Sequence, residues 1–210
     1  MKVLAVFNTK GGSGKSTISM HVGVAASEKL NTVILDADPN KSSFNWGKTR
    51  ETEKPAVKET SSARLLAEIA ELKKAGVDLV ILDCPPSINA DTVALVSAAD
   101  FVVVPVQPTI LDVTGCYNAT KMITAQKKPF VYIVSRCPTP SQDTREAIAA
   151  LEKSGEVCPV VVSDRIAFSR ALAYGLAVTE YEKTGKAYEE AMQSCKWILE
   201  KIGAADGTQK

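Results

Sequence analysis

A glycine-rich segment near the start of the chain holds the residues best suited to chemistry. It reads Lys10-Gly11-Gly12-Ser13-Gly14-Lys15-Ser16-Thr17 and lies directly between an apolar run and a helical pattern. Glycines let a backbone fold tightly around phosphate oxygens, and a helix that begins there adds the positive end of its dipole. In such a loop Lys15 meets the β- and γ-phosphates, Ser16 ligates Mg²⁺ and Thr17 reaches the α-phosphate. The segment therefore predicts a site for ATP and Mg²⁺ in which residues 11–17 bind the nucleotide.

The segment departs from the common phosphate-loop pattern at one position. The pattern G-x-x-x-x-G-K-[ST] begins with a glycine, and Thr9 occupies that place here. A chance glycine-rich turn is the alternative interpretation. The strand pattern before the segment and the helix pattern after it favour a nucleotide site.

Three aspartates follow short apolar runs elsewhere in the chain: Asp36, Asp38 and Asp83. Ligands of open α/β sheets bind at the carboxyl ends of the strands, where these side chains are expected. A carboxylate there can hold the water shell of Mg²⁺ or orient an attacking water molecule. Two purely structural alternatives remain open. Asp36 and Asp38 could simply form a turn before Pro39, and Asp83 could be an ordinary strand-ending aspartate.

The rest of the sequence alternates between apolar runs and helical patterns. Buried strands are expected at 3–7, 32–35, 79–82, 101–104 and 130–134, with a sixth at 157–162. Helices are expected at 15–28, 63–74, 91–98, 113–124, 142–151 and 186–202, and the stretch 45–62 is expected to be an exposed, irregular excursion. This alternation predicts an α/β fold with a doubly wound, mostly parallel sheet and helices on both faces. We expect one P-loop ATPase domain over residues 1–203 and a polar tail over 204–210.

Composition limits the classes of protein that fit. The chain has 210 residues, 45% of them hydrophobic, and a net charge of +1, so no global charge attracts nucleic acid or membrane. Five scattered cysteines without a C-x-x-C pair predict buried free thiols in a reducing compartment rather than a zinc site or a disulfide framework. No signal peptide or membrane-spanning run is recognisable, so we expect a cytoplasmic protein.

The order of these motifs resembles that of the ParA/MinD ATPases. The loop, with Lys10 before its first glycine, is similar to the deviant Walker A loop of that family, which commonly lacks the glycine at position 9. Residues 36–40 resemble the family's D-x-D-P-Q motif, with Asn40 in place of glutamine. Residues 79–83 form a Walker B pattern, and 83–86 resemble the D-x-P-P switch that senses the γ-phosphate. The resemblance covers nearly all of the chain.

The resemblance implies roles for single residues. Lys10 would reach across an ATP-dependent homodimer to the partner's phosphates, where without the resemblance it could be an ordinary solvated lysine. Asp38 would position the hydrolytic water. Asp36 and Asp83 would support Mg²⁺ together with Ser16. Arg136 falls where relatives contact adenine. Asp112, after a proline-rich segment at 104–108, is expected only to cap a helix.

Within the family, the short chain resembles small ParA-type partition ATPases that lack an N-terminal helix-turn-helix domain. The resemblance implies slow basal ATP hydrolysis, non-specific binding to nucleoid DNA as an ATP dimer, and a small centromere-bound partner that stimulates turnover during plasmid or chromosome partition. Arg165 and Arg170 fall where relatives contact phosphates. Six basic and six acidic residues between positions 164 and 201 leave a solvated, salt-bridged face as the alternative.

Two other branches remain alternatives. A MinD-like membrane-associated ATPase would need a basic amphipathic helix at the C-terminus, but the last helical pattern carries acidic residues on its polar face. A metabolic P-loop enzyme of the same fold would not need Lys10. We expect no membrane contact.

Overall fold

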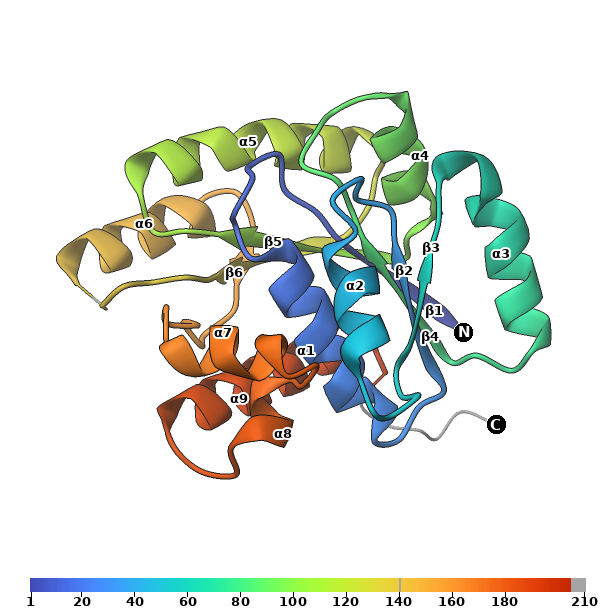
Figure 1. Cartoon of the computed structure of the whole chain (residues 1–210). Coiled ribbons are helices and arrows are strands. Elements are labelled where there is room, and N and C mark those ends of the chain that lie inside the picture. Colours follow the sequence, from blue (N-terminus) through green and yellow to red (C-terminus); the bar gives the residue numbers. More distant parts are fainter. Residues whose placement is uncertain (140, 205–210) are drawn as a thin grey trace.

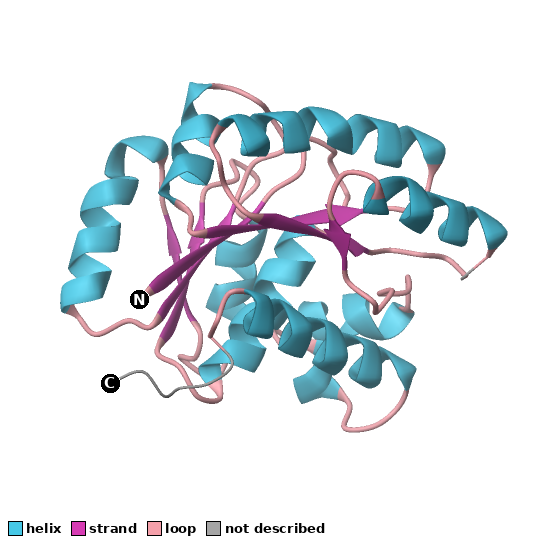
Figure 2. Cartoon of the chain, turned by 180° about the vertical axis from the view of Figure 1, so that it is seen from behind, coloured by secondary structure: helices cyan, strands magenta, loops and turns pink. Residues whose placement is uncertain are grey.

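The computed structural model describes residues 1–139 and 141–204 and shows a central sheet between two layers of helices (Figure 1). Within these residues, seven parallel strands follow the order β3-β2-β4-β1-β5-β6-β7. Their bounds are β1 Lys2–Val6, β2 Thr32–Asp36, β3 Ala56–Glu59, β4 Leu79–Asp83, β5 Phe101–Val106, β6 Phe130–Val134 and β7 Glu156–Val157. Helices lie on both faces of the sheet (Figure 2), so the predicted doubly wound α/β fold is confirmed.

In the part of the chain that the structure describes, four helices cover one face of the sheet: α3 Ser62–Lys74, α4 Ala90–Ala98, α5 Ile110–Ala125 and α6 Gln142–Glu152. Successive side chains of a strand point to opposite faces, and β1 shows this division. Val3 and Ala5 pack into the core with Leu65 of α3, whereas Leu4 and Val6 pack into the core on the other face. Because both faces are covered, the strands are apolar almost without interruption.

Five helices of the described residues cover the second face: α1 Lys15–Ser27, α2 Ser42–Thr49, α7 Ile166–Ala173, α8 Val178–Tyr181 and α9 Lys186–Lys201. Trp46 of α2, Phe168 of α7 and Ile198 of α9 are buried in the same core. The loop from β1 to α1 lies at the carboxyl end of the sheet. There β1 is flanked by β4 and β5, and Asp36 stands opposite Asp83 across the β2–β4 pair.

Two predicted elements were wrong in part. The strand expected at 157–162 is only the two-residue β7, because Pro159 has no N–H to continue the ladder. The stretch 45–62 is less irregular than expected, since it contains most of α2 and the edge strand β3. Both α2 and β3 are short, and β3 alternates between exposed and half-buried residues. Neither element therefore produces a long apolar run in the sequence.

The five cysteines are free and buried, as predicted. No helix in residues 1–139 and 141–204 is long and apolar enough to cross a bilayer. Most of the expected polar tail lies outside the described residues, and the division at residue 203 stays a prediction.

Candidate nucleotide site

The glycine-rich loop turns through left-handed backbone between β1 and α1. Gly12 has φ 76° and Gly14 has φ 95°, and a Cβ on Gly14 would lie 3.2 Å from Ser135 Oγ. Residues with a side chain rarely adopt this backbone, so both glycines are required by the turn. Gly14 is also the N-cap of α1, which leaves the first N–H groups of the helix available to an anion.

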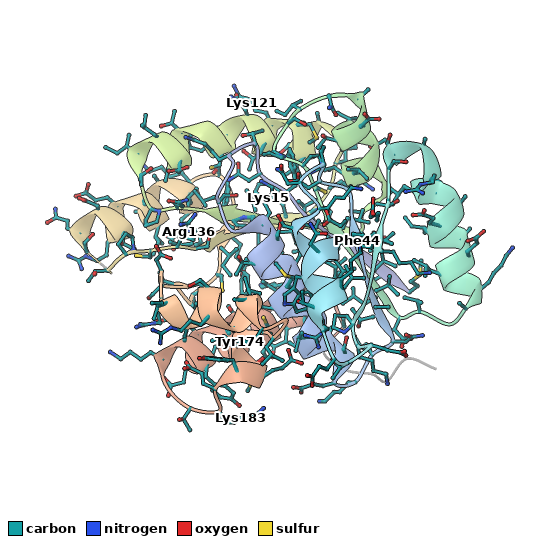
Figure 3. All side chains as sticks on the ribbon, viewed as in Figure 1. Lys15, Phe44, Lys121, Arg136, Tyr174 and Lys183 are labelled. Carbon is teal, nitrogen blue, oxygen red and sulfur yellow. The ribbon has the colours of Figure 1, made fainter. Side chains whose placement is uncertain are left out.

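Three side chains hold the loop from the neighbouring strand ends. Ser135 Oγ donates a 2.6 Å hydrogen bond to the carbonyl of Ser13, while Gln107 Nε2 and Arg136 Nη1 donate to the carbonyl of Gly12 at 2.8 and 3.0 Å. These bonds occupy carbonyl oxygens of the loop, which would otherwise repel phosphate. Arg136 and Lys15 both line the cleft, and both lie at the carboxyl end of the sheet (Figure 3).

Lys15 is buried beneath the loop. Its Nζ donates to the carbonyl of Lys10 at 3.0 Å, and burial lowers the pKa of its ammonium, while the charges of Asp83 and Asp38 raise it. The ammonium is thus held between the loop and two carboxylates, where it can turn to a phosphate that enters the cleft.

Asp83, the last residue of β4, is completely buried. Ser43 Oγ donates to its Oδ2 at 2.6 Å, whereas its Oδ1 is buried and has no hydrogen-bond partner among residues 1–139 and 141–204. Burial raises the pKa of Asp83 to about 7, and the neighbouring hydroxyls of Ser43 and Ser16 lower it. An unsatisfied carboxylate oxygen beside a serine hydroxyl is a donor set that fits Mg²⁺, which prefers oxygen ligands and keeps several waters.

Asp36 organises the turn that follows β2. Its Oδ1 accepts from the N–H of Asp38 at 3.0 Å and its Oδ2 from the N–H of Phe44 at 2.9 Å. Burial raises the pKa of this carboxyl, and the two backbone hydrogen bonds lower it. Both oxygens therefore hold backbone in place, which makes turn formation an observed role of Asp36. Its support of the metal stays a prediction.

A cleft of about 380 Å³ opens beside the loop. Asp38 lines it as well, with its Oδ1 accepting a 2.9 Å hydrogen bond from the N–H of Asn40. The second wall comes from the segment before α7 and from α7 itself. The lining includes Gly11, Gly12, Gly14, Lys15, Ser16, Thr17, Asp38, Pro86, Arg136, Ser163, Arg165, Phe168, Ser169 and Leu172.

Lys10 lies at the outer side of the loop, with 42% of its side chain exposed. Its Nζ is 3.8 Å from a carboxylate oxygen of Asp112, and its methylenes run along Gly115 of α5. The sequence predicts that Asp112 caps this helix, and this prediction is wrong. Thr109 caps α5 by accepting from the N–H of Asp112 at 3.1 Å. Asp112 therefore lies in the first turn, where its Oδ2 accepts from the Thr109 hydroxyl and its Oδ1 faces Lys10.

The structure places the two arginines of the predicted DNA surface in different environments. Arg165 pairs with Glu190 of α9, with Nη2 to Oε1 at 2.7 Å and Nε to both carboxylate oxygens at 3.1 Å, and it lines the nucleotide cleft. Arg170 is exposed in the last turn of α7. Their role in DNA binding stays a prediction.

Sequence reasoning did not assign the contacts of Ser43, Gln107 and Ser135. Gln107 and Ser135 directly follow β5 and β6, so their place at strand ends was a usable signal. Ser43 belongs to α2, a helix the sequence pattern did not reveal, and it reaches Asp83 over 40 residues of chain.

The sequence profile of the CobQ/CobB/MinD/ParA nucleotide binding domain matches residues 4–178, which includes the loop, the three aspartates and most of the cleft. The chain belongs to this family. As a member of the ParA/MinD group of ATPases, it has the nucleotide-binding fold that its phosphate loop predicted.

Similar proteins include several ParA/MinD-type proteins. A protein for maintenance of carboxysome distribution from Halothiobacillus neapolitanus is 28% identical over 194 residues, which cover 87% of this chain and 89% of that protein. A Rhizobium radiobacter ParA protein is 28% identical over 131 residues, 61% of this chain and 59% of that protein.

Two solved structures share the fold. A Cyanothece McdA variant in complex with ATP superimposes with a TM-score of 0.77 at 18% identity, covering 100% of this chain and 99% of that chain. MinD from Pyrococcus horikoshii, complexed with Mg-ADP, has a TM-score of 0.78 at 13% identity and covers 99% of both chains.

Proposed function

We propose that this ParA/MinD-family ATPase hydrolyses ATP in an ATP-dependent homodimer, binds DNA without sequence preference and thereby partitions a plasmid or chromosome. A small partner protein bound to the cargo's centromere stimulates hydrolysis, and the ATPase is associated with the nucleoid. The observation that carries the proposal is Lys10, a half-exposed cation at the edge of a complete phosphate site, held on Asp112 of the neighbouring helix.

The geometry of the cleft supports hydrolysis. Lys15 is placed to neutralise charge on the phosphates, and Asp38 lines the same cleft near Lys15, where it can orient a water molecule. Ser16 and Asp83 would hold Mg²⁺, which would stabilise charge on the phosphate oxygens when bound.

An apolar patch beside Lys10 supports a second copy of the chain as its partner. Ile110 and Leu111, in the first turn of α5, are 86% and 75% exposed, and the next residue is the partner of Lys10. Adjacent apolar side chains this exposed are typical of an association surface. In the dimer, Lys10 would leave Asp112 for the phosphates bound by the other copy.

Two substitutions test the dimer by opposite outcomes. Lys10→Ala should stay monomeric with ATP and Mg²⁺, because the phosphates at the interface lose their compensating charge. Asp38→Ala should accumulate as an ATP-bound dimer, because the step that dissolves the dimer is blocked. Light scattering after size exclusion measures both, with Lys121→Ala, an exposed lysine of α5 (Figure 3), as the matched control. The same oligomeric state in both variants would refute one of the two roles.

The DNA arm is tested separately. ATP should promote binding to DNA of arbitrary sequence, measured as an electrophoretic mobility shift. Replacing Arg165 and Arg170 together should weaken this binding and flatten its dependence on salt. Because Arg165 is paired with Glu190, Arg170→Ala alone should account for most of the loss. ATP-dependent pelleting with liposomes, without any DNA shift, would instead support a MinD-like membrane function.

A second cargo is favoured by one observation. The relative from Halothiobacillus neapolitanus, which this chain matches over most of its length, is named for carboxysome distribution. A protein cluster could therefore replace the plasmid or chromosome as cargo, with the same ATP cycle. Identifying which protein stimulates the ATPase would decide between the two.

A further inference from the structure

The single histidine of the chain has no place in the chemistry described above, yet both its ring nitrogens are engaged. His21 lies in α1, where its Nδ1 is 2.7 Å from the carbonyl of Thr17 and its Nε2 is 3.0 Å from the N–H of Val178. An N–H can only donate, so Nε2 must accept and Nδ1 must carry the proton. The neutral ring thus joins Thr17, in the first turn of its own helix α1, to the first residue of α8.

The segment that His21 contacts is tied to α7 by backbone hydrogen bonds, and side chains from other parts of the chain also bind its carbonyl groups. Of its residues 175–178, the first three lie between α7 and α8, and Val178 begins α8. Arg50 Nη1 donates to the carbonyl of Gly175 at 2.9 Å, and Trp46 Nε1 donates to the carbonyl of Leu176 at 3.4 Å. Gly175 passes so close to α2 that a Cβ there would lie 2.6 Å from the carbonyl oxygen of Thr49.

The helices α1 and α2, which contact this segment, both begin at the nucleotide site. α1 starts with Lys15, and α2 carries Ser43, which is bonded to Asp83. Two separate links therefore run from the site to residues 175–178, one through His21 and one through α2.

The segment in turn positions a wall of the cleft. The preceding helix, α7, contributes Phe168, Ser169 and Leu172 to the lining, and the ring of Phe168 lies 5.2 Å from that of His21. Tyr174, at the end of α7, lies well below Lys15 and the loop in Figure 3. A displacement of residues 175–178 would therefore move the wall relative to the loop.

We propose that His21 is a positioning residue for nucleotide binding: by bridging Thr17 and Val178 it fixes α7 at the correct distance from the phosphate loop. This proposal rests on the proposed function only in that the cleft binds ATP. His21 touches no phosphate, so its loss should weaken binding and leave the hydrolytic step, which depends on Lys15 and Asp38, largely unchanged.

Substitutions at position 21 separate the two contacts. The amide oxygen of glutamine can replace the Nε2 acceptor, whereas the shorter asparagine can replace only the Nδ1 donor. His21→Asn and His21→Leu should weaken binding of the non-hydrolysable analogue AMPPNP about tenfold, roughly the effect of one hydrogen bond. His21→Gln should bind within about twofold of the unaltered protein. Calorimetric titration in Mg²⁺ gives the Kd values, and phosphate release gives kcat and KM.

A second pair of variants removes the same bond from the other side and keeps the histidine. Val178 is the first residue of α8, where proline is well tolerated, and Ala177 before it has φ −79° and ψ 159°, an extended backbone that suits a following proline. Val178→Pro deletes the N–H that His21 accepts from. Val178→Ala is the matched control, because it also shortens the side chain but keeps the N–H.

The proposal predicts that Val178→Pro raises the Kd for AMPPNP and the KM for ATP about tenfold over Val178→Ala, at a nearly equal kcat. Equal affinities of these two variants, or an equal loss in His21→Gln and His21→Leu, would overturn it and leave His21 a purely structural residue. Absence of AMPPNP binding by the unaltered protein would refute both the proposed function and this proposal. Normal binding with no difference between the paired variants would refute this proposal alone.

Discussion

The two helical layers of this ATPase are built from different kinds of contact. Between α3, α4 and α5, side-chain hydrogen bonds such as Ser62 to Asp91 and Ser97 to Gln126 lie at the exposed rim, above an apolar core. Between α1, α2 and α8, they are buried or half-buried.

On this second layer, Ser43 binds Asp83, His21 binds the backbone of α8, and Arg50 pairs with Glu180 at 2.8 Å. Buried polar contacts fix geometry more strictly than apolar packing does, because misplacement leaves a polar group unsatisfied. The first layer is therefore a scaffold, and the second sets the geometry of the nucleotide site.

The largest expected effect tests the site itself. Lys15→Ala should weaken ATP binding roughly a thousandfold, because it removes about two charge-assisted hydrogen bonds of about 2 kcal/mol each to the phosphates. Lys74→Ala, an exposed lysine of α3 on the scaffold layer, is the control and should bind ATP normally. Titration calorimetry measures both, and normal affinity in Lys15→Ala would end the assignment of the phosphate loop.

The next prediction tests the scaffold. Leu65 of α3 is 1% exposed, and Leu65→Ala should lower the free energy of unfolding by about 3 kcal/mol through lost burial and a cavity. At a temperature where the variant remains folded, its affinity for AMPPNP should equal that of the unaltered protein. Urea unfolding and calorimetry provide the two values. A loss of affinity comparable to that of His21→Leu would remove the distinction between the layers.

The smallest effect concerns pH. Burial lowers the pKa of His21 to about 4, against the raising effects of the Thr17 carbonyl and Glu180. The unfolded chain, with an ordinary histidine near 6.5, then binds the extra proton between these two values, so stability falls as pH decreases through this window. His21→Gln should lose part of this pH dependence of stability. Its melting temperature should therefore fall less than that of the unaltered protein when the pH is lowered from about 7 to about 5. Identical slopes for both proteins would show that other groups dominate.

Much of the fold could be predicted because its signal is local. The strands β1, β2, β4, β5 and β6 are continuous apolar runs, and Asp36 and Asp83 end their strands as expected. The missed features depend on distant parts of the chain. His21 meets Val178 across 157 residues, and Arg165 meets Glu190 across 25. In α2 only Ser43 and Trp46 are buried, too few to give an apolar periodicity.

The two edges of the sheet bear on self-association of another kind. On one side β3 is four residues long and carries Lys58 and Glu59, and on the other β7 has two residues, followed shortly by Pro159. Short, charged or proline-blocked edges are poor templates for an added strand. Strand pairing between the sheet edges of two molecules is thus disfavoured. Any larger assembly would have to form through the helices or the nucleotide face.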